Sequence, residues 1–446
     1  MRRLFACLAA ATTVLGALIA TAPSAAAADS GTFNVLSYNV AGLPESLSSA
    51  STPRDTSTTT IGQRIAPYDI VHVEEDFNYH SYLYAADTAH AYRTPTSGGA
   101  GIGSGLNTLS KIPYDEDDFE RVHWNSCQVD SGDCLTPKGF TFMRERLAEG
   151  VYVDFYNLHT NAGTNDGDEA SRADNLNQLT DFIKAHSAGN AVVVMGDTNT
   201  RYTRSADTIA EFGAANGLTD AWVQLIRGGA APAKGSDALV CDQSGATVPN
   251  TCEVVDKVLY RGSKLVSLSA TSYNNEHAKF LTDAGLMLSD HDPLTVGFSW
   301  SRNSAYQLSD QFGGPHGDYY NDIDSVPAGA RATTIALRSG ARVDQMSLTL
   351  ANGTTLAHGG TGGTASSLTL GSGEYVTSTQ LCQGTYSDRT RIFYAKFTTN
   401  LGNTLAGGTP TSDCVTRTAP SGWQTAGFHG RSGDAVDKIG FIYTQR

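Results

Sequence analysis

The chain has 446 residues, enough for two domains or slightly more, and only 17% of them are charged. Its formal net charge of −14 disfavours a polyanion such as nucleic acid as the main partner, because long-range repulsion opposes the encounter. Beyond the N-terminal segment, no stretch approaches the ~20 apolar residues of a membrane-spanning helix.

The N-terminal segment has the layout of an export signal. Arg2 and Arg3 precede an apolar stretch over residues 4–20, and alanines occupy 25–28. A charged start, a short apolar core and small residues at the end are typical of a secretory signal peptide. A membrane anchor is the alternative, and the shortness of the apolar core argues against it. We therefore predict a signal peptide at 1–28 and a secreted, extracellular mature protein.

Six cysteines remain once Cys7 leaves with this segment. An even number in an exported chain indicates disulfide bonds, although six cysteines allow fifteen connectivities. A zinc site fits less well, because the sequence has no Cys-x-x-Cys pair and no clustered histidines. Grouping along the chain favours the pairs Cys127–Cys134, Cys241–Cys252 and Cys382–Cys414.

From Asp29 to about Trp300, apolar strand-like runs alternate with helix-like stretches such as 171–186 and 205–216. This alternation predicts an α/β sandwich with buried sheets. Two long loops, roughly 91–105 and 228–252, are rich in Gly, Ser and Ala. Loops of this length in a compact domain are usually functional or mobile.

Polar residues stand at or near the C-terminal ends of six strand-like runs. Active sites are commonly assembled in this way, from side chains at the ends of strands in a rigid sheet. Carboxylate and amide oxygens bind hard divalent cations, and imidazoles transfer protons near neutral pH. The set therefore predicts a metal-dependent hydrolase. Its members are Asn39 after 33–36, Glu75 after 70–73, His159 after 151–156, Asp197 and Asn199 after 192–195, Asp256 after 254–255, and Asp290 and His291 within 289–293.

After Arg302 the composition changes to Gly, Thr and Ser, and helix signals disappear. Short alternating strands, such as 332–337, 345–350 and 391–397, are separated by Gly-rich turns. This pattern predicts an all-β domain. We place the boundary near 301–309, which gives a first domain at 29–302 and a second at 303–446.

Six motifs of the first domain occur in a characteristic order. They are Tyr38-Asn39, Asp69-Ile70-Val71-x-x-Glu74-Glu75, Leu158-His159, Gly196-Asp197-x-Asn199, Val255-Asp256 and Ser289-Asp290-His291. Over about 33–296 the chain resembles the endonuclease/exonuclease/phosphatase superfamily, which includes deoxyribonuclease-like nucleases, sphingomyelinases and inositol-phosphate phosphatases. The resemblance implies a four-layered α/β sandwich and a metal-dependent phosphodiesterase.

The resemblance also implies how the site is divided between metal binding and proton transfer. Glu75 and Asn39 would hold Mg²⁺ or another divalent cation, with Asp290 or water completing the oxygen shell. His291 would be the general base and Asp256 its orienting partner. Water would attack phosphorus directly, with no covalent intermediate.

Three further residues would act on the phosphate. Asp197 and Asn199 would orient the attacking water or the phosphoryl oxygens, and a plain Asx-turn is their structural alternative. His159 would stabilise the developing charge or protonate the leaving group, and a packed structural histidine is its alternative. Glu74 departs from the family pattern, which usually has an amide there.

Lys138-Gly139-Phe140 is similar to an element of bacterial neutral sphingomyelinases. Lys138 would bind a substrate phosphate, or it could lie in a solvated turn. The stretch 273–287 is apolar enough to dip into a bilayer interface if exposed, and a buried strand explains it equally well. The aromatic-tipped hairpin of well-known sphingomyelinases is not seen, which puts a choline-lipid substrate in doubt.

We expect a membrane phospholipid as substrate, cleaved in the manner of a phospholipase C or sphingomyelinase, with peripheral membrane contact. An extracellular deoxyribonuclease-like nuclease is the alternative. It needs a basic and aromatic groove, for which Arg201 and Arg204 are the nearest candidates, so nucleic acid ranks below lipid. A carbohydrate-binding protein with an inactive hydrolase domain is the non-enzymatic alternative.

Glycine-rich motifs recur through the second domain. They are 312–317, 358–363, 373–376 and Phe428-His429-Gly430-Arg431-Ser432-Gly433-x-x-x-Asp437-x-Ile439-Gly440. The domain resembles jacalin-like lectins, which implies a β-prism of three sheets and a carbohydrate ligand. In that family Asp437 would accept sugar hydroxyls, the backbone amides of Asp434 and Ala435 would donate, and Gly313, Gly314 and Gly433 would let the backbone approach the ring. A prism that has lost its ligand is the alternative.

Overall fold

The structure is a computed structural model that describes residues 28–98, 102–129 and 132–446. The predicted signal peptide lies outside these ranges except for its last residue. Within the described residues, no helix combines the length and apolar character needed to cross a bilayer. The three predicted disulfide pairs are confirmed: Cys127–Cys134, Cys241–Cys252 and Cys382–Cys414.

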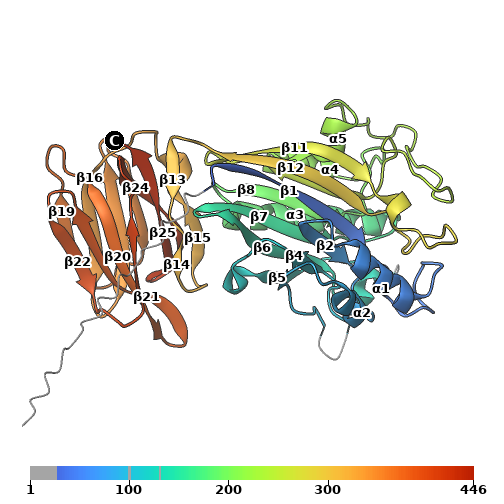
Figure 1. The fold of residues 1–446 in the computed structure, drawn as a ribbon, viewed down its shortest axis with the longest axis horizontal. Helices are drawn as coiled ribbons and strands as arrows, with labels where there is room; N and C mark the ends of the chain where they lie inside the picture. The colour runs from blue at the N-terminus through green and yellow to red at the C-terminus, as the bar shows by residue number, and fades with distance from the viewer. Residues whose placement is uncertain (1–27, 99–101, 130–131) are drawn as a thin grey trace, which may run out of the picture.

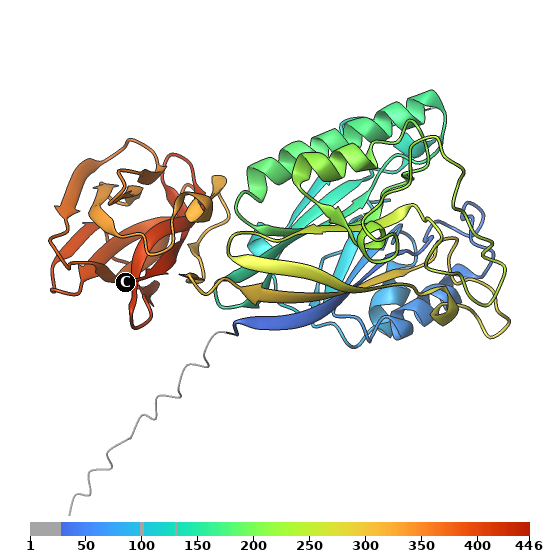
Figure 2. The same ribbon diagram turned by 90° about the horizontal axis from the view of Figure 1, so that it is seen from above.

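The first part of the chain forms two six-stranded sheets that lie face to face (Figures 1 and 2). One sheet has the order β11-β12-β1-β2-β4-β3 and the other β5-β6-β7-β8-β10-β9. The strands of the first are β1 Ser30–Asn39, β2 Ile70–Glu74, β3 Tyr92–Arg93, β4 Asn107–Ser110, β11 Val266–Asn275 and β12 Leu294–Arg302. Those of the second are β5 Glu120–His123, β6 Gly139–Ala148, β7 Val151–His159, β8 Ala191–Asp197, β9 Thr219–Asp220 and β10 Asp256–Arg261.

Helices cover the outer face of each sheet. They are α1 Arg54–Arg64, α2 His80–Ala86, α3 Asp166–His186, α4 Ile209–Asn216 and α5 Ala221–Leu225. The sandwich also has the 3₁₀ turns η1 Glu116–Asp118, η2 Asp133–Leu135 and η3 His277–Lys279, and a fourth, η4 Asp322–Ser325, lies in the second part of the chain. Ile61 of α1 and Leu83 of α2 pack against the face of β2 that carries Val71. Leu179 of α3 joins the larger core between the sheets and α3. The predicted four-layered α/β sandwich is confirmed.

Helix α3 begins earlier than its apolar pattern suggests. Asn165 accepts a hydrogen bond from the Asp168 amide, and the Asp168 carboxylate accepts from the Asn165 amide. This reciprocal capping satisfies backbone N–H groups that the first turn of a helix leaves unpaired. The polar segment before Ser171 is therefore helical.

Strand direction places the functional residues at one edge. Strands β1 and β2 are parallel, as are β7 and β8, so Asn39, His159 and Asp197 all stand at C-terminal strand ends. The prediction that Asp256 also ends a strand is wrong, because Asp256 begins β10. Since β10 runs antiparallel to β8, Asp256 lies opposite Asp197 at the same edge. The segment 289–293 likewise precedes β12 instead of ending a strand.

The second part of the chain consists of three antiparallel sheets and is all β, as predicted. The sheets are β13-β25-β24-β15 with β14 beside β25, β18-β17-β16-β19, and β22-β21-β20-β23. Their strands are β13 Tyr306–Leu308, β14 Phe312–Gly313, β15 Asp318–Asn321, β16 Ala332–Ser339, β17 Val343–Leu350, β18 Thr355–Gly359, β19 Thr364–Thr369, β20 Val376–Tyr386, β21 Arg389–Thr399, β22 Thr404–Gly408, β23 Cys414–Thr418, β24 Trp423–Ser432 and β25 Val436–Gln445. We refer to this part as the prism.

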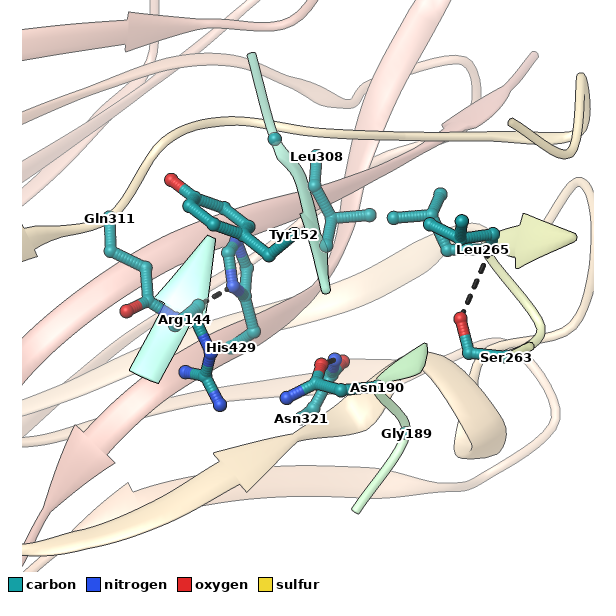
Figure 3. Close-up of a pocket in the computed structure, with 12 residues that line it drawn as sticks. Arg144, Tyr152, Gly189, Asn190, Ser263, Leu265, Leu308, Gln311, Asn321 and His429 are labelled. Carbon is teal, nitrogen blue, oxygen red and sulfur yellow. Dashed lines mark hydrogen bonds between the residues drawn. The ribbon is translucent and has the colours of Figure 1, made fainter. Parts of the chain in front are cut away.

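Ion pairs join the prism to the sandwich. Arg431 lies 3.0 Å from Asp118, and Lys438 lies 2.5 Å from Asp115 and 3.0 Å from Asp118. Figure 3 shows a second part of the junction, where Tyr152 of β7 and Arg144 of β6 lie beside Gln311 and His429 of the prism. The end of the sandwich that carries α1 and α2 points away from the prism (Figure 1).

Candidate active site

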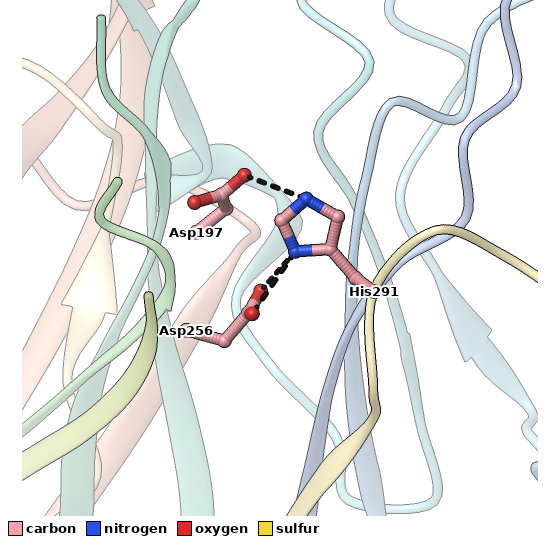
Figure 4. Close-up of side chains that lie close together, drawn as sticks. All are labelled: Asp197, Asp256 and His291. Carbon is pink, nitrogen blue, oxygen red and sulfur yellow. Dashed lines mark hydrogen bonds and ion pairs between the residues drawn. The ribbon is translucent and has the colours of Figure 1, made fainter. Parts of the chain in front are cut away.

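His291 lies between two carboxylates contributed by neighbouring strands (Figure 4). Its Nδ1 is 3.0 Å from Asp256 Oδ2, and its Nε2 is 3.7 Å from Asp197 Oδ2. Asp197 ends β8, Asp256 begins β10, and the loop before β12 supplies His291 from the opposite sheet. The site is thus assembled across both sheets.

Three more predicted residues lie around this group. His159 Nε2 is 3.3 Å from Asp197 Oδ2 and 4.0 Å from Glu75 Oε1. The Asn39 amide donates to Glu75 Oε1 and Asp197 Oδ2, each at 3.2 Å. The structure therefore brings Asn39, Glu75, His159 and Asp197 together, as the sequence predicts.

Backbone conformation is unusual where the site is built. Ala41, Glu75 and Asn199 have φ values of 49°, 56° and 49°, in a region that residues other than glycine seldom adopt. Such conformations persist where surrounding contacts enforce them, and they gather at functional sites. At Gly42 a Cβ would lie 2.3 Å from the Glu75 carbonyl oxygen, so only glycine lets this loop approach Glu75.

Burial and neighbouring charges shift the pKa values of His291 and His159 in opposite directions. Burial lowers the pKa of His291, but Asp256 and Asp197 outweigh it and raise the pKa well above 6.5. Burial and then the Lys138 charge lower the pKa of His159 to about 3, against the attraction of Asp197. His159 is therefore a neutral hydrogen-bonding group at neutral pH, whereas His291 is the group that binds a proton.

The carboxylates also differ. Burial alone would raise the pKa of Asp197, but His291, His159 and Lys138 outweigh it and lower the pKa to about 2. Burial raises the pKa of Glu75, and the Asn39 hydrogen bond only partly offsets this. The Asp290 charge adds to this rise, while Lys138 and His291 oppose it without cancelling it.

The donor set around Glu75 fits a hard divalent cation. Glu75 and the exposed Asp290 both carry carboxylates, and the Asp290 charge adds to burial in raising the pKa of Glu75. Oxygen donors of this type are the ones that Mg²⁺ prefers. Asn39 Oδ1 accepts the Ala41 amide at 3.0 Å, so the Asn39 NH₂ group faces the carboxylates in this arrangement. Asn39 thus bridges Glu75 and Asp197.

A second set of ligands overlaps the first. Asp197, Asp256 and His291 offer ligand atoms within 4.8 Å of one another. His291 Nδ1 is held by the Asp256 carboxylate and its Nε2 faces Asp197 at 3.7 Å, which competes with use of the ring as a metal ligand. The Glu75 side of the site is therefore the better match for a cation.

Lys138 reaches the site from the disulfide-bridged loop. Its Nζ is 2.5 Å from Asp133 Oδ1 and 3.4 Å from the Thr160 carbonyl oxygen, and its side chain is 9% exposed. Asn199 donates to the same Thr160 carbonyl oxygen at 3.3 Å, and its amide N–H donates to Asp197 Oδ1 at 2.9 Å. Lys138 is therefore a buried cation next to the site, and the solvated-turn alternative is wrong.

The nearest candidate cations for a nucleic-acid groove are engaged within the protein. Arg201 donates to the Glu253 carbonyl oxygen, and Arg204 donates to the Asn199 carbonyl oxygen at 2.9 Å. Arg204 also lies 3.4 Å from Asp207. These side chains hold the loop after Asn199 in place, so they offer little to a phosphate backbone.

Two buried acidic residues beside the site have surroundings that the sequence does not predict. Glu74 is completely buried, neither of its carboxylate oxygens has a hydrogen-bond partner among the described residues, and burial followed by Asp256 and Asp197 raises its pKa. Asp292, next to His291, is paired with buried His277 at 2.6 Å. The departure at Glu74 is visible in the sequence, whereas nothing in the sequence pairs Asp292 with His277.

The stretch 273–287 is mostly buried. Tyr273 is 8% and Phe280 2% exposed, and Tyr273 belongs to β11. Leu286 differs, because it is 51% exposed beside the bridge between Leu281 and Met287. A bilayer-contacting role for this stretch is therefore limited to the turn around Leu286.

The prism loop after β24 encloses Asp437. The Gly314 amide donates to the Asp437 carbonyl oxygen at 2.9 Å, and the Gly433 amide donates to the Ala435 carbonyl oxygen at 3.0 Å. Arg391 NH1 is 3.3 Å from Asp437 Oδ1, and the Asp437 side chain is only 2% exposed. The remaining predicted residues lie in the same loops, with Gly313 paired to the residue after Asp437 and Asp434 exposed at the tip.

Comparison with known proteins agrees with both parts of this description. The family model described as "Endonuclease/Exonuclease/phosphatase family 2" matches residues 53–297, and the "Jacalin-like lectin domain" model matches residues 309–442. A protein named "Sphingomyelinase" from Mycobacterium tuberculosis is 42% identical over 277 residues, covering 61% of this chain and 53% of that protein. The barley (Hordeum vulgare) protein named "Horcolin" is 30% identical over 130 residues, covering 28% of this chain and 89% of that protein.

Solved structures are similar at low sequence identity. The crystal structure of SmcL is 16% identical, with a TM-score of 0.42, and the match covers 60% of this chain and 99% of that one. The wild-type Malaysian banana lectin is 23% identical, with a TM-score of 0.28, and the match covers 31% of this chain and 99% of that one. The chain spans about half the length of the sphingomyelinase relatives that it matches. It belongs to the endonuclease/exonuclease/phosphatase family and carries a jacalin-like lectin domain after the catalytic fold.

Proposed function

We propose that this chain is a secreted, Mg²⁺-dependent phosphodiesterase that hydrolyses the headgroup phosphodiester of a membrane phospholipid. The observation that carries the proposal is the convergence of Glu75, Asp197 and His291 at one edge of the two sheets. The 42% identity with proteins named sphingomyelinase supports a phospholipid over other phosphodiesters. Three disulfide bonds support secretion, because such bonds persist in oxidising compartments.

The side chains fit direct attack by water. A cation held by Glu75 and Asp290 would neutralise the phosphoryl oxygens and ease attack on phosphorus. His291, once neutral, takes the water proton at Nε2 while Asp256 holds its Nδ1–H. The water oxygen bonds to phosphorus as the bond to the lipid oxygen breaks, and that oxygen leaves with a proton from solvent. No covalent enzyme intermediate is needed.

Two other residues position the phosphate. Neutral His159 donates a hydrogen bond from Nε2, which faces Asp197 and Glu75 and is suited to a phosphoryl oxygen. The cation Lys138 lies close enough to lower the pKa values of both His159 and Asp197, so its charge acts at the same place. Both residues favour a transition state that carries more negative charge than the free site.

Exposed apolar side chains at the catalytic end support a lipid surface as partner. Leu47 follows β1, Leu135 precedes β6, Val240 precedes β10 and Leu286 precedes β12, with exposures of 68%, 83%, 59% and 51%. Strand direction brings all four connections to the edge that holds the active site. Apolar side chains around the mouth of a site are suited to partial insertion among lipid headgroups.

Headgroup release from vesicles tests the enzymatic proposal. Vesicles of sphingomyelin, phosphatidylcholine and phosphatidylinositol, and plasmid DNA as a separate substrate, are incubated with the protein in Mg²⁺ or EDTA. We expect phosphorylated headgroup from at least one lipid in Mg²⁺ only, and no DNA cleavage. DNA cleavage without lipid hydrolysis would replace the lipid substrate with nucleic acid. Absence of both activities, with Mg²⁺ binding intact, would support an inactive hydrolase domain.

We further propose that the prism binds carbohydrate at the loop around Asp437. The loop is closed by hydrogen bonds from Gly314 and Gly433, and Arg391 holds the Asp437 carboxylate. Glycan-array binding by the full chain is expected to disappear in Asp437→Ala and to persist in Asp324→Ala, which removes an exposed carboxylate of the η4 turn, outside the loops around Asp437. Unchanged binding by Asp437→Ala would remove Asp437 from the sugar site.

A further inference from the structure

The junction between sandwich and prism contains a cavity of about 290 Å³. Its wall includes Tyr114, Arg144 and Tyr152 from the sandwich and Gln311 and Arg417 from the prism. Junctions between domains are frequent places for small-ligand sites, and this volume is near the lower end of the range for such pockets. The cavity is distinct from the catalytic edge, which lies at the other end of the sandwich (Figure 1).

The arginines on the sandwich side of the wall are neutralised. Arg144 Nε lies 2.7 Å from Asp154 Oδ1, and its NH2 lies 3.1 Å from the other oxygen of that carboxylate. Arg146 pairs with Asp310 in the same two-bond manner, at 3.0 and 2.8 Å. Two-bond pairs of this kind hold both partners in a fixed geometry and balance their charges. These residues form a fixed frame for the cavity.

The acidic groups of the wall are neutralised as well. Asp118 lies 3.0 Å from both Arg431 and Lys438, and Asp115 lies 2.5 Å from Lys438. Two carboxylates thus face two cations. Asp115 and Asp118 therefore add no net negative charge to the wall of the cavity.

Arg417 remains without a counter-charge. Among the described residues its only hydrogen bond runs from NH2 to the Gln311 carbonyl oxygen at 3.3 Å, and its buried Nε has no partner. That one partner among the described residues is a neutral carbonyl oxygen, not a carboxylate. A guanidinium that is partly buried and lacks an acceptor is costly, and a bound anion would supply the missing acceptor.

The side chain of Gln311, which also lines the cavity, is held in one orientation by its neighbours. His429 Nε2–H donates to the Ser309 carbonyl oxygen at 3.0 Å, so His429 Nδ1 accepts the Gln311 amide at 2.9 Å. Burial lowers the pKa of His429 to about 4, which keeps the ring neutral and this arrangement intact at neutral pH. Figure 3 shows the Gln311 amide oxygen pointing away from His429. A polar group is thereby held beside Arg417 by a rigid neighbour.

We propose that this junction cavity binds a small polar ligand that carries a carboxylate or phosphate, with Arg417 meeting its negative charge and Gln311 its polar body. The site touches both domains, so a bound ligand fixes their relative position. The proposal is independent of the phosphodiesterase activity and of the Asp437 loop. Binding experiments with one carboxylate and one phosphate compound distinguish the two kinds of ligand.

Isothermal titration calorimetry on the full chain, without lipid or metal, tests the site. The probes are lactate for a carboxylate, glycerol 3-phosphate for a phosphate, and glycerol as a neutral control. None of them is a sugar, and we expect one or both anions to bind and glycerol not to bind. The anion that binds identifies the chemistry. Arg417→Gln is expected to weaken binding by about tenfold or more, since charge-assisted hydrogen bonds are the strong ones.

Matched variants separate this site from others. Arg331→Gln removes an exposed prism arginine outside the wall and should bind as the unaltered protein does. Asp437→Ala should also bind normally, because the sugar loop is elsewhere. Arg417→Gln without probe should unfold at a temperature no lower than that of the unaltered protein, because it removes an unpaired buried charge, and this result excludes misfolding as the cause. Equal affinity in Arg417→Gln, loss of binding in Asp437→Ala, or failure of both anions to bind would each overturn the proposal.

Discussion

His291 Nδ1 lies 3.0 Å from Asp256 Oδ2, although 35 residues separate them in the chain. The two side chains come from opposite sheets, and Asp256 is buried whereas His291 is partly exposed. The carboxylate therefore fixes the ring from the protein side and leaves Nε2 directed toward the open site. This relationship sets both the tautomer of His291 and its affinity for a proton.

Asp256→Asn is expected to move the acid limb of the kcat/KM–pH profile to lower pH. His291 accepts a proton only when neutral, so activity rises as pH passes upward through its pKa. Asp256 and Asp197 together raise that pKa above 6.5 despite burial, and loss of one charge lowers it. The plateau rate falls too, because the ring loses its orienting partner. An acid limb that does not move would contradict the assignment of His291 as the titrating base.

His291→Ala is expected to lower kcat by roughly 10²–10⁴-fold, the range typical for loss of a general base. Mg²⁺ binding, measured by calorimetry, should persist because Glu75 and Asp290 are unchanged. His316→Ala, a histidine of the prism, serves as the control and should keep full activity. Retention of activity by His291→Ala would shift the role of base to another group.

Glu74→Gln is expected to stabilise the protein increasingly as pH rises from 5 to 8. Burial, then Asp256 and Asp197, raise the folded-state pKa of Glu74 above 4.5, so the folded side chain stays neutral while the unfolded one ionises. A raised carboxyl pKa costs stability as pH increases through and above the unfolded value. A glutamine side chain ionises in neither the folded nor the unfolded state, so this loss of stability is absent in the variant. Thermal unfolding of both proteins across this pH range is the measurement, and a constant difference in Tm would show that Glu74 is ionised when folded.

Acidification is expected to destabilise the domain junction through His429. Burial lowers its folded-state pKa from 6.5 to about 4, so between these values the unfolded chain binds a proton that the folded chain does not. Stability is therefore full above pH 6.5 and falls by up to about 1.4 kcal/mol per pH unit on the way to pH 4. Urea unfolding of His429→Gln should show a shallower pH dependence over this interval. An equal slope in both proteins would exclude the histidine as the source.

The site could be predicted from the sequence to a large extent because its residues stand in short motifs at strand boundaries. Predicting that four of these residues converge required only that parallel strands end at a common edge; they are Asn39, Glu75, His159 and Asp197. The prediction that a strand ends before Asp256 is wrong, because the apolar pair Val254-Val255 resembles a strand but is not part of one. In the structure the Val255 carbonyl oxygen instead accepts from Thr198, and pairing begins one residue later.

Other features depend on contacts that no local pattern encodes. The pairing of Asp118 with Lys438 joins residues 320 positions apart, and it exists only once two separate folds have docked. The orientation of the Asn39 amide likewise depends on Ala41, whose left-handed backbone is not expected for alanine. Tertiary contacts determine these details.

Strand β1 has a further consequence. It leaves Asp29, which pairs with Arg302 beside the prism, and arrives at Asn39 in the catalytic edge, a span of about 33 Å for ten residues. The catalytic edge therefore lies a full strand length from the junction with the prism. On the roles proposed for the two domains, a carbohydrate bound by the prism would belong to a different molecule from the phosphodiester under hydrolysis, so the protein would attach to one component of a surface and act on another.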